Sequence, residues 1–321
     1  MMESLLKKYA KLLVNYCVEL KEGEKLFLST TTLAEPLVRE IFREALRIGG
    51  HVEVDFKFRE QSKLFLDLAS KEVLSSEPVL YSEAIKNFDA YINIRAPFNL
   101  NETSNVKPEA RKLRSQAMGD LSKIYFERTA DRKLPGALKR SLCQYPTQAS
   151  AQAANMSLEE YQQFVFNACH LYSENPEGEW LKIRKSQQKI KEYLDGVKSI
   201  RYKADHTDVS FSVDGRTWIN SDGQTNMPSG EVFSGPVENS VNGKVHFGTI
   251  FELPFLSVWL SVTINRFAPE AKSIAPPTPK SGFPGTAQFA KSPFSSICNP
   301  PIMATSICLP RIMAKLSALS K

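Results

Sequence analysis

The stretch 226–247, NMPSGEVFSGPVENSVNGKVHF, holds the residues of this chain that are best suited to do chemistry. Glu231 follows a Pro-Ser-Gly turn and stands between strand-like segments, and Glu238 comes seven residues later. A carboxylate in such a loop can bind a hard cation or accept a proton from water. Loops on a rigid scaffold often carry function. A solvated turn residue is the ordinary alternative for Glu231, and its surroundings alone leave both readings open.

Histidines and cysteines offer fewer candidates. His206 lies in Ala-Asp-His-Thr-Asp, whose acidic residues are typical of metal sites, but it precedes a strand and we expect it to be exposed. His246 alternates with Val245 and Phe247, so we expect it on a strand, facing solvent or the sheet edge. The five cysteines are scattered and form no CxxC pair, which argues against a disulfide framework and a thiolate zinc site. Reduced thiols and a cytoplasmic location are therefore expected.

The charge distribution argues against a nucleic-acid partner. The net charge is +6, but residues 251–321 hold seven Lys/Arg and only two acids, so the rest of the chain is nearly neutral. It shows no basic stripe of the kind that follows phosphates. The longest near-apolar run, 253–264, is shorter than the ~20 residues that cross a bilayer. The charged N-terminus does not resemble a secretory signal, so no membrane association is expected.

The elements that must position Glu231 begin with an α/β region over residues 1–150. Strand-like runs at 25–29, 51–58 and 90–95 alternate with helical patterns, and the helix over 33–48 stops at Gly49-Gly50. Repeated strand–helix–strand units favour a mostly parallel sheet with helices packed on it. No glycine-rich phosphate loop follows any of these strands, which argues against nucleotide binding.

Two further segments follow this region. Residues 151–196 are predicted to be a helical connector, in which Ser157 and Glu160 form a capping box. From Ser199 onward the pattern turns to strands, with turn signals at Asp214-Gly215 and Asp222-Gly223. The sequence therefore predicts a domain boundary near residue 197 and a second domain over 197–247.

The tail, residues 248–321, has a different character. Residues 251–321 contain ten of the nineteen prolines and ten serines, but no aspartate or histidine. Prolines remove hydrogen-bond donors and interrupt helices, so we expect about 70 irregular residues. The tail is also rich in Phe, Ile and Leu, unlike a polar linker. Translation in a shifted reading frame is one explanation of this composition.

Residues 216–247, RTWINSDGQTNMPSGEVFSGPVENSVNGKVHF, carry a family resemblance. They are similar to the aminopeptidase T/aminopeptidase S-like metallo-aminopeptidases, the thermophilic leucyl aminopeptidase group. Upstream, LLKKYAKLLVNYCVELKEGEKLFL and NMSLEEYQQFVFNA also look like that family, so the resemblance covers about residues 3–247. A string as long as NMPSGEVF…GPVENSVNG is far more specific than a short motif.

The resemblance implies an N-terminal α/β domain, an α+β catalytic domain and a homodimer. It also implies a peptide substrate with a free N-terminus and two divalent metal ions, zinc or cobalt. Two cations would polarise the scissile carbonyl and lower the pKa of a bridging water. Glu231 matches the first metal-ligating Glu of the family.

The sequence departs from the family beyond Phe247. The family supplies a second Glu from a Gly-Glu pair, a His, and then a His-x-Asp pair. Here the last histidine is His246, and Glu252 and Glu270 are the only later acids. Three or more protein ligands are usual for a catalytic cation, so the catalytic domain is predicted to be incomplete.

These observations leave two functional predictions. The first is a metal-dependent aminopeptidase by ancestry, with Glu231 as a ligand, that is inactive in this chain. The alternative is a truncated or frameshifted scaffold or dimerisation remnant without catalysis. The resemblance is lost within a residue or two of Gly248, which favours a shifted frame over gradual divergence.

Overall fold

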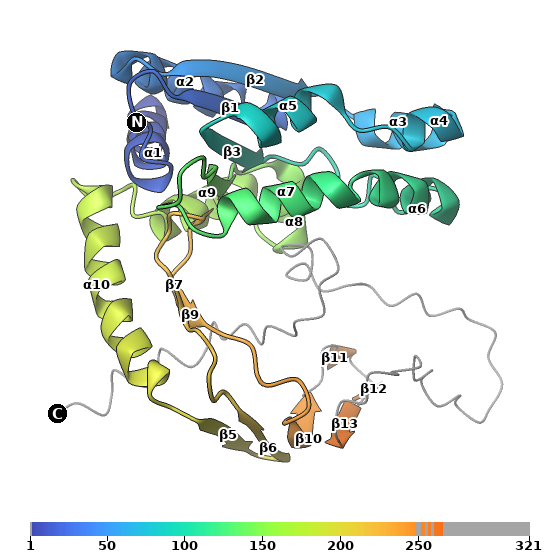
Figure 1. Cartoon of the computed structure of the whole chain (residues 1–321), viewed down its shortest axis with the longest axis vertical. Coiled ribbons are helices and arrows are strands. Elements are labelled where there is room, and N and C mark those ends of the chain that lie inside the picture. Colours follow the sequence, from blue (N-terminus) through green and yellow to red (C-terminus); the bar gives the residue numbers. More distant parts are fainter. Residues whose placement is uncertain (1, 248–251, 254–255, 258–259, 266–321) are drawn as a thin grey trace. The chain divides into compact units, whose positions relative to one another are not determined.

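A computed structural model describes residues 2–247, 252–253, 256–257 and 260–265 of this chain (Figure 1). The chain divides into two compact units. The first unit comprises Met1–Lys185 and Ser221–Gly230, and the second comprises Ser186–Asn220 and Glu231–Lys321. Each unit is described by itself below.

The first unit is built on a five-stranded sheet in the order β2-β1-β3-β4-β8, in which every neighbouring pair is parallel. This confirms the mixed α/β fold with a parallel sheet that the sequence predicts. Its strands are β1 (Lys25–Thr31), β2 (His51–Lys57), β3 (Ala90–Arg95), β4 (Lys139–Gln144) and β8 (Asn226–Met227).

Helices connect these strands. The α-helices are α1 (Met2–Lys11), α2 (Glu35–Ile48), α3 (Gln61–Leu68), α4 (Lys71–Leu74), α5 (Val79–Asn87), α6 (Pro108–Ala117), α7 (Gly119–Thr129), α8 (Gln148–Ala153), α9 (Leu158–Ala168) and α10 (Pro176–Asp195), which continues into the second unit. A π-helix (Leu12–Cys17) extends α1, and a short 3-10 helix (Thr32–Ala34) precedes α2.

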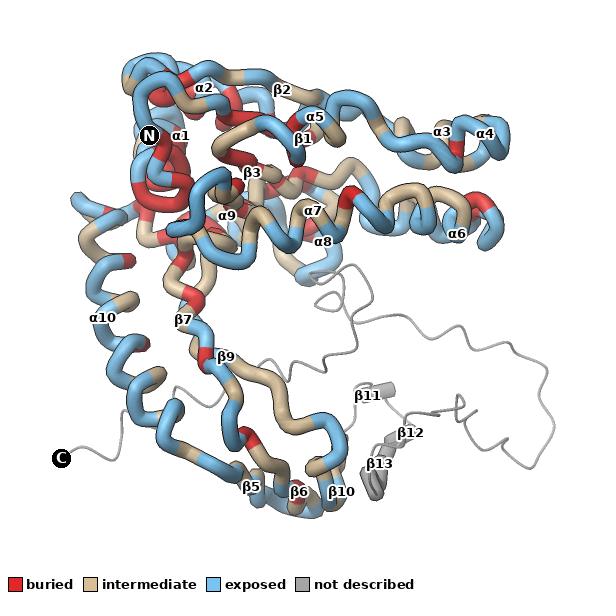
Figure 2. The backbone as a smooth tube through the Cα atoms, in the orientation of Figure 1, coloured by how far each residue is buried: buried red, intermediate tan, exposed pale blue. Residues whose placement is uncertain are grey.

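The central strands are buried on both faces because successive side chains of a strand point to opposite sides of a sheet. Along β1, Leu26 and Leu28 join the main core with residues of α1, α2 and α9. Phe27 lies between them and joins a second core with Ala84 of α5 and Leu121 of α7. Figure 2 shows the resulting red stretches in α1 and the central strands, whereas α3 and α4 are mostly exposed. Helices on both faces are what a parallel sheet requires.

Local sequence signals set two helix ends. Gly49 ends α2 with φ 85°, a left-handed conformation that glycine adopts without steric cost. The Ser157 hydroxyl accepts from the Glu160 amide, and the Glu160 carboxylate accepts from the Ser157 amide, at the start of α9. Both the predicted C-terminal stop and the predicted capping box are confirmed.

Strand β8 returns to the first unit from far along the sequence. Leu142 of β4 pairs with Asn226 of β8, and Met227 is only 1% exposed within the main core. Nearby, Arg184 Nε donates to Asp222 Oδ2 at 2.5 Å. Residues 221–230 are thus held in this unit by strand pairing, apolar packing and an ion pair.

The second unit consists mainly of strands. Its main sheet has the order β13-β10-β6-β5 with antiparallel neighbours, and β7 and β9 form a two-stranded sheet. The strands are β5 (Ser199–Ala204), β6 (Thr207–Ser212), β7 (Ile219–Ser221), β9 (Glu231–Phe233), β10 (Asn242–Phe247), β11 (Glu252–Leu253), β12 (Leu256–Ser257) and β13 (Leu260–Asn265).

The predicted irregular tail falls mostly outside the described residues. Its described parts are β11, β12 and β13, and the irregularity of the remainder stays a prediction. The domain limits predicted at residues 150, 196 and 247 also stay predictions. Among the described residues, no helix combines the length and the apolar character that crossing a membrane requires.

Candidate functional site

Glu231 is the first residue of β9, directly after the Pro-Ser-Gly turn. Two hydrogen bonds to Ser221 hold this turn. Ser221 Oγ lies 2.6 Å from Ser229 Oγ, and the Gly230 amide donates to Ser221 O at 3.1 Å. Gly230 has φ 117°, a backbone conformation that residues other than glycine rarely adopt. The chain therefore enters β9 from a defined turn, as the Pro-Ser-Gly composition predicts.

The backbone of Glu231 is fixed from α10. Gln187, whose side chain is buried, donates from Nε2 to Glu231 O at 2.6 Å. The Glu231 residue as a whole is exposed. A fixed backbone that carries an exposed carboxylate is compatible with a ligand position and equally with a solvated strand end.

Glu238 is engaged in an ion pair of its own. It lies in the turn at 238–239, and Arg216 Nη2 donates to its Oε2 at 2.5 Å. A hydrogen bond from its own backbone amide and the neighbouring Arg216 lower the pKa of the Glu238 carboxyl. These contacts stabilise the charged form of the carboxyl. They give Glu238 a structural role in its loop.

The described residues do not fit a two-metal centre. Nowhere in the described ranges do three His, Cys, Asp or Glu residues gather closely enough to hold a metal ion. Neither Glu231 nor Glu238 therefore belongs to such a group among the described residues. A catalytic divalent site normally takes three protein ligands and keeps an open position, so Glu231 as a metal ligand stays a prediction.

Two histidines that the sequence treats separately lie side by side in the second unit. The ring centroids of His206 and His246 are 5.4 Å apart, with 61° between the ring planes. His206 is exposed in the turn before β6, as predicted, and His246 lies on β10. Their proximity depends on the pairing of β10 with β6, which no local pattern reveals.

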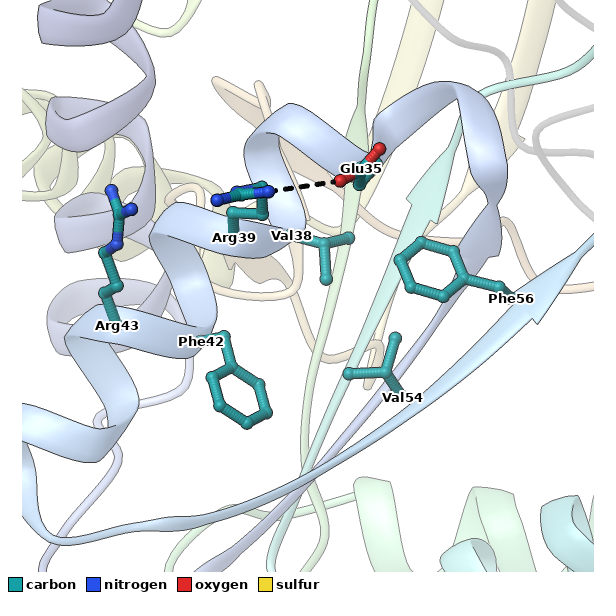
Figure 3. A pocket seen from close by; sticks show the side chains of 7 residues that line it. All are labelled: Glu35, Val38, Arg39, Phe42, Arg43, Val54 and Phe56. Atoms are coloured by element: carbon teal, nitrogen blue, oxygen red, sulfur yellow. Dashed lines mark hydrogen bonds and ion pairs between the residues drawn. The ribbon is translucent and has the colours of Figure 1, made fainter.

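A pocket of about 430 Å³ opens between α2 and β2 of the first unit (Figure 3). Figure 3 shows Arg39 and Glu35 at its rim, joined by an ion pair of 3.5 Å. Its seven lining residues include no histidine, cysteine or hydroxyl, so it offers no nucleophile: Glu35, Val38, Arg39, Phe42, Arg43, Val54 and Phe56.

The remaining candidates belong to the core. Trp180 and Trp218 are 1% and 8% exposed, so both are core residues. Cys143 and Cys169 are buried, and burial raises the pKa of both thiols. A neutral buried thiol is a poor nucleophile.

Comparison with known proteins decides the family. Residues 2–250 match the family described as thermophilic metalloprotease (M29). The chain belongs to this family. The resemblance predicted over about residues 3–247 is thereby confirmed, and the match ends close to the predicted break.

Two relatives put this M29 chain in context. Aminopeptidase 2 of Geobacillus stearothermophilus is 26% identical over 270 residues, which cover 76% of this chain and 63% of that protein. The structure of wild-type AmpT from Thermus thermophilus superposes with a TM-score of 0.62 at 20% identity and covers 77% of this chain and 65% of that chain. The chain spans less than two thirds of the length of either relative, and the AmpT likeness shows the fold alone.

Proposed function

We propose that this chain derives from metal-dependent aminopeptidases, which remove N-terminal residues from peptides, and that it does not catalyse this reaction itself. The observation that supports the proposal most is that Glu231 belongs to no group of metal ligands among the described residues. In the described ranges no group of three His, Cys, Asp or Glu forms. Beyond Phe247 the sequence has no histidine and no aspartate.

The chemistry explains why this matters. Hydrolysis with two cations needs ligands that hold both ions against their hydration and leave a position for water and substrate. A single exposed carboxylate provides neither the number nor the geometry of donors. In intact relatives two divalent ions, zinc or cobalt, are expected, and Glu231 would be one of their ligands.

A non-catalytic scaffold or dimerisation remnant is the second candidate. It is favoured by the first unit, whose sheet has buried cores on both faces; among the described residues, the members of these cores all precede Gly230. A homodimer and a cytoplasmic location stay predictions, and the three buried free cysteines, Cys17, Cys143 and Cys169, support the reducing environment.

Release of leucine from a leucine anilide tests the proposal. The full chain is assayed with added Zn²⁺ or Co²⁺ beside Glu231→Ala, with Glu238→Ala as a matched control that removes a carboxylate from the same loop. We expect all three proteins to release no leucine above the metal-only background. Activity in the parent chain and in Glu238→Ala that is lost in Glu231→Ala would overturn the proposal.

The coding DNA gives a second test of the shifted frame. Beyond codon 247, the other two frames are translated and searched for a Gly-Glu pair followed by a His-x-Asp pair. Their recovery supports a frameshift. If neither frame contains them, the tail is a divergent sequence and the frameshift hypothesis is wrong.

A further inference from the structure

The second unit carries a pair of histidines whose placement is set by the sheet. In the antiparallel pairing of β10 with β6, Asn242 is opposite Ser210 and Lys244 is opposite Asp208. Continuing this register by two residues places His246 opposite His206. Directly opposed residues of antiparallel strands have Cβ atoms about 4.5–5.5 Å apart, which agrees with the close approach of the two rings.

Two backbone features fix this juxtaposition. The β5–β6 hairpin closes through the pair Ala204–Thr207, and His206 adopts φ 58° in the two-residue turn. The His246 amide donates to Thr207 Oγ1 at 2.8 Å, which ties β10 to the residue next to His206. The turn and the strand therefore hold the two histidines together before any ligand binds.

The distance between the rings fits a shared metal ion. Zinc binds an imidazole nitrogen at about 2.0–2.1 Å, and the ring centroid lies about 1.2 Å further on, so two imidazoles at a tetrahedral angle have centroids about 5.2 Å apart. The observed separation is 5.4 Å. Neutral imidazole is also the commonest protein ligand for transition metals.

Charged residues surround the two histidines without forming a larger ligand group with them. Asp208 is held by Arg201, which donates from Nε and Nη2 at 2.7 and 2.6 Å, and this contact lowers the pKa of the Asp208 carboxyl. Asp205, exposed beside His206 in the turn, adds negative charge near a bound cation. Lys244 on β10 is opposite Asp208. Among the described residues, no third His, Cys, Asp or Glu joins the two histidines in a group that could hold a metal ion.

We propose that exposed His206 and half-buried His246 together bind a divalent transition-metal ion such as Zn²⁺, at a site that does not include Glu231. Because two protein ligands hold the ion, we expect it to bind more weakly than in a site with three or four protein ligands. A metal ligand has to be deprotonated, so we expect acid to weaken the binding.

Titration calorimetry with Zn²⁺ on the full chain, without a polyhistidine tag, tests this site. The variants are His206→Asn, which suits a left-handed turn residue, and His246→Gln. His51→Asn is the matched control because His51 is an exposed histidine of the first unit. Loss of one ligand removes the intramolecular advantage of the pair, so each variant should bind about tenfold more weakly or worse.

The outcomes separate this site from the family's metal centre. One Zn²⁺ per chain that is weakened by His206→Asn and His246→Gln but retained in His51→Asn and Glu231→Ala supports the proposal. Unchanged binding in His206→Asn, or no binding to the parent chain, overturns it. Circular dichroism checks that each variant is folded, and if His246→Gln is not, His206→Asn decides.

Discussion

Replacing Gly223 by alanine tests how tightly residues 221–230 are built into the first unit. Gly223 has φ 96°, and an added Cβ would lie 2.8 Å from Trp180 Cε3 and 3.0 Å from Met227 Cε. The left-handed conformation costs a residue with a Cβ about 1–2 kcal/mol, and overpacking a filled core costs about 1–3 kcal/mol. We therefore expect Gly223→Ala to lower the free energy of unfolding by about 2–5 kcal/mol.

The matched control is Gly23→Ala in the same unit. Gly23 has φ 79°, and nothing lies within 4 Å of an added Cβ, so this variant carries the conformational cost alone. Urea unfolding followed by circular dichroism reports on the first unit, which holds most of the helices of the described chain. If Gly223→Ala were no more destabilising than Gly23→Ala, the packing of Gly223 against Trp180 would be refuted.

Three further predictions concern this unit and its helices. Met227→Ala should destabilise the first unit by about 2–5 kcal/mol because it empties a buried site, and thermal unfolding measures the loss. In a Cys298→Ser/Cys308→Ser background, a thiol reagent such as Ellman's reagent should label the native chain only on unfolding, and rapid labelling of the folded protein would contradict the burial of Cys17, Cys143 and Cys169. The pKa of Glu160 is lowered by its bonds with Ser157, so its contribution is present above the ordinary glutamate pKa and is lost as the pH falls through the folded value. The stability difference between the parent and Glu160→Gln, measured by urea unfolding, should shrink from neutral pH to about pH 3; a constant difference would contradict the capping box.

The local sequence was sufficient where the cause of structure is local. Gly49 ends α2 because the last turn requires positive φ, and Ser157 and Glu160 begin α9 because they satisfy free amides. The alternation of Leu26, Phe27 and Leu28 reports burial on both faces of β1. A parallel sheet follows from such signals, and the structure contains it.

Features that depend on distant pairing could not be predicted in this way. Strand β8 has two residues, too few to show a period, and its partner Leu142 lies far away in the sequence. The approach of His206 to His246 depends on the register of β10 against β6, which neither histidine encodes alone. For Glu231 the family string identifies the position, whereas its ligand role depends on residues that the described chain does not bring to it.

The return of β8 to the first sheet also has a consequence for synthesis. A chain that leaves the ribosome presents β1 to β4 well before Met227, which fills the main core. Because closing a long loop carries an entropic cost, distant pairings form late and slowly. The first unit therefore cannot complete its sheet until residues 221–230 have emerged, and until then one edge of β4 stays unpaired. During that interval the open edge of β4 presents unpaired backbone groups that another chain could pair with.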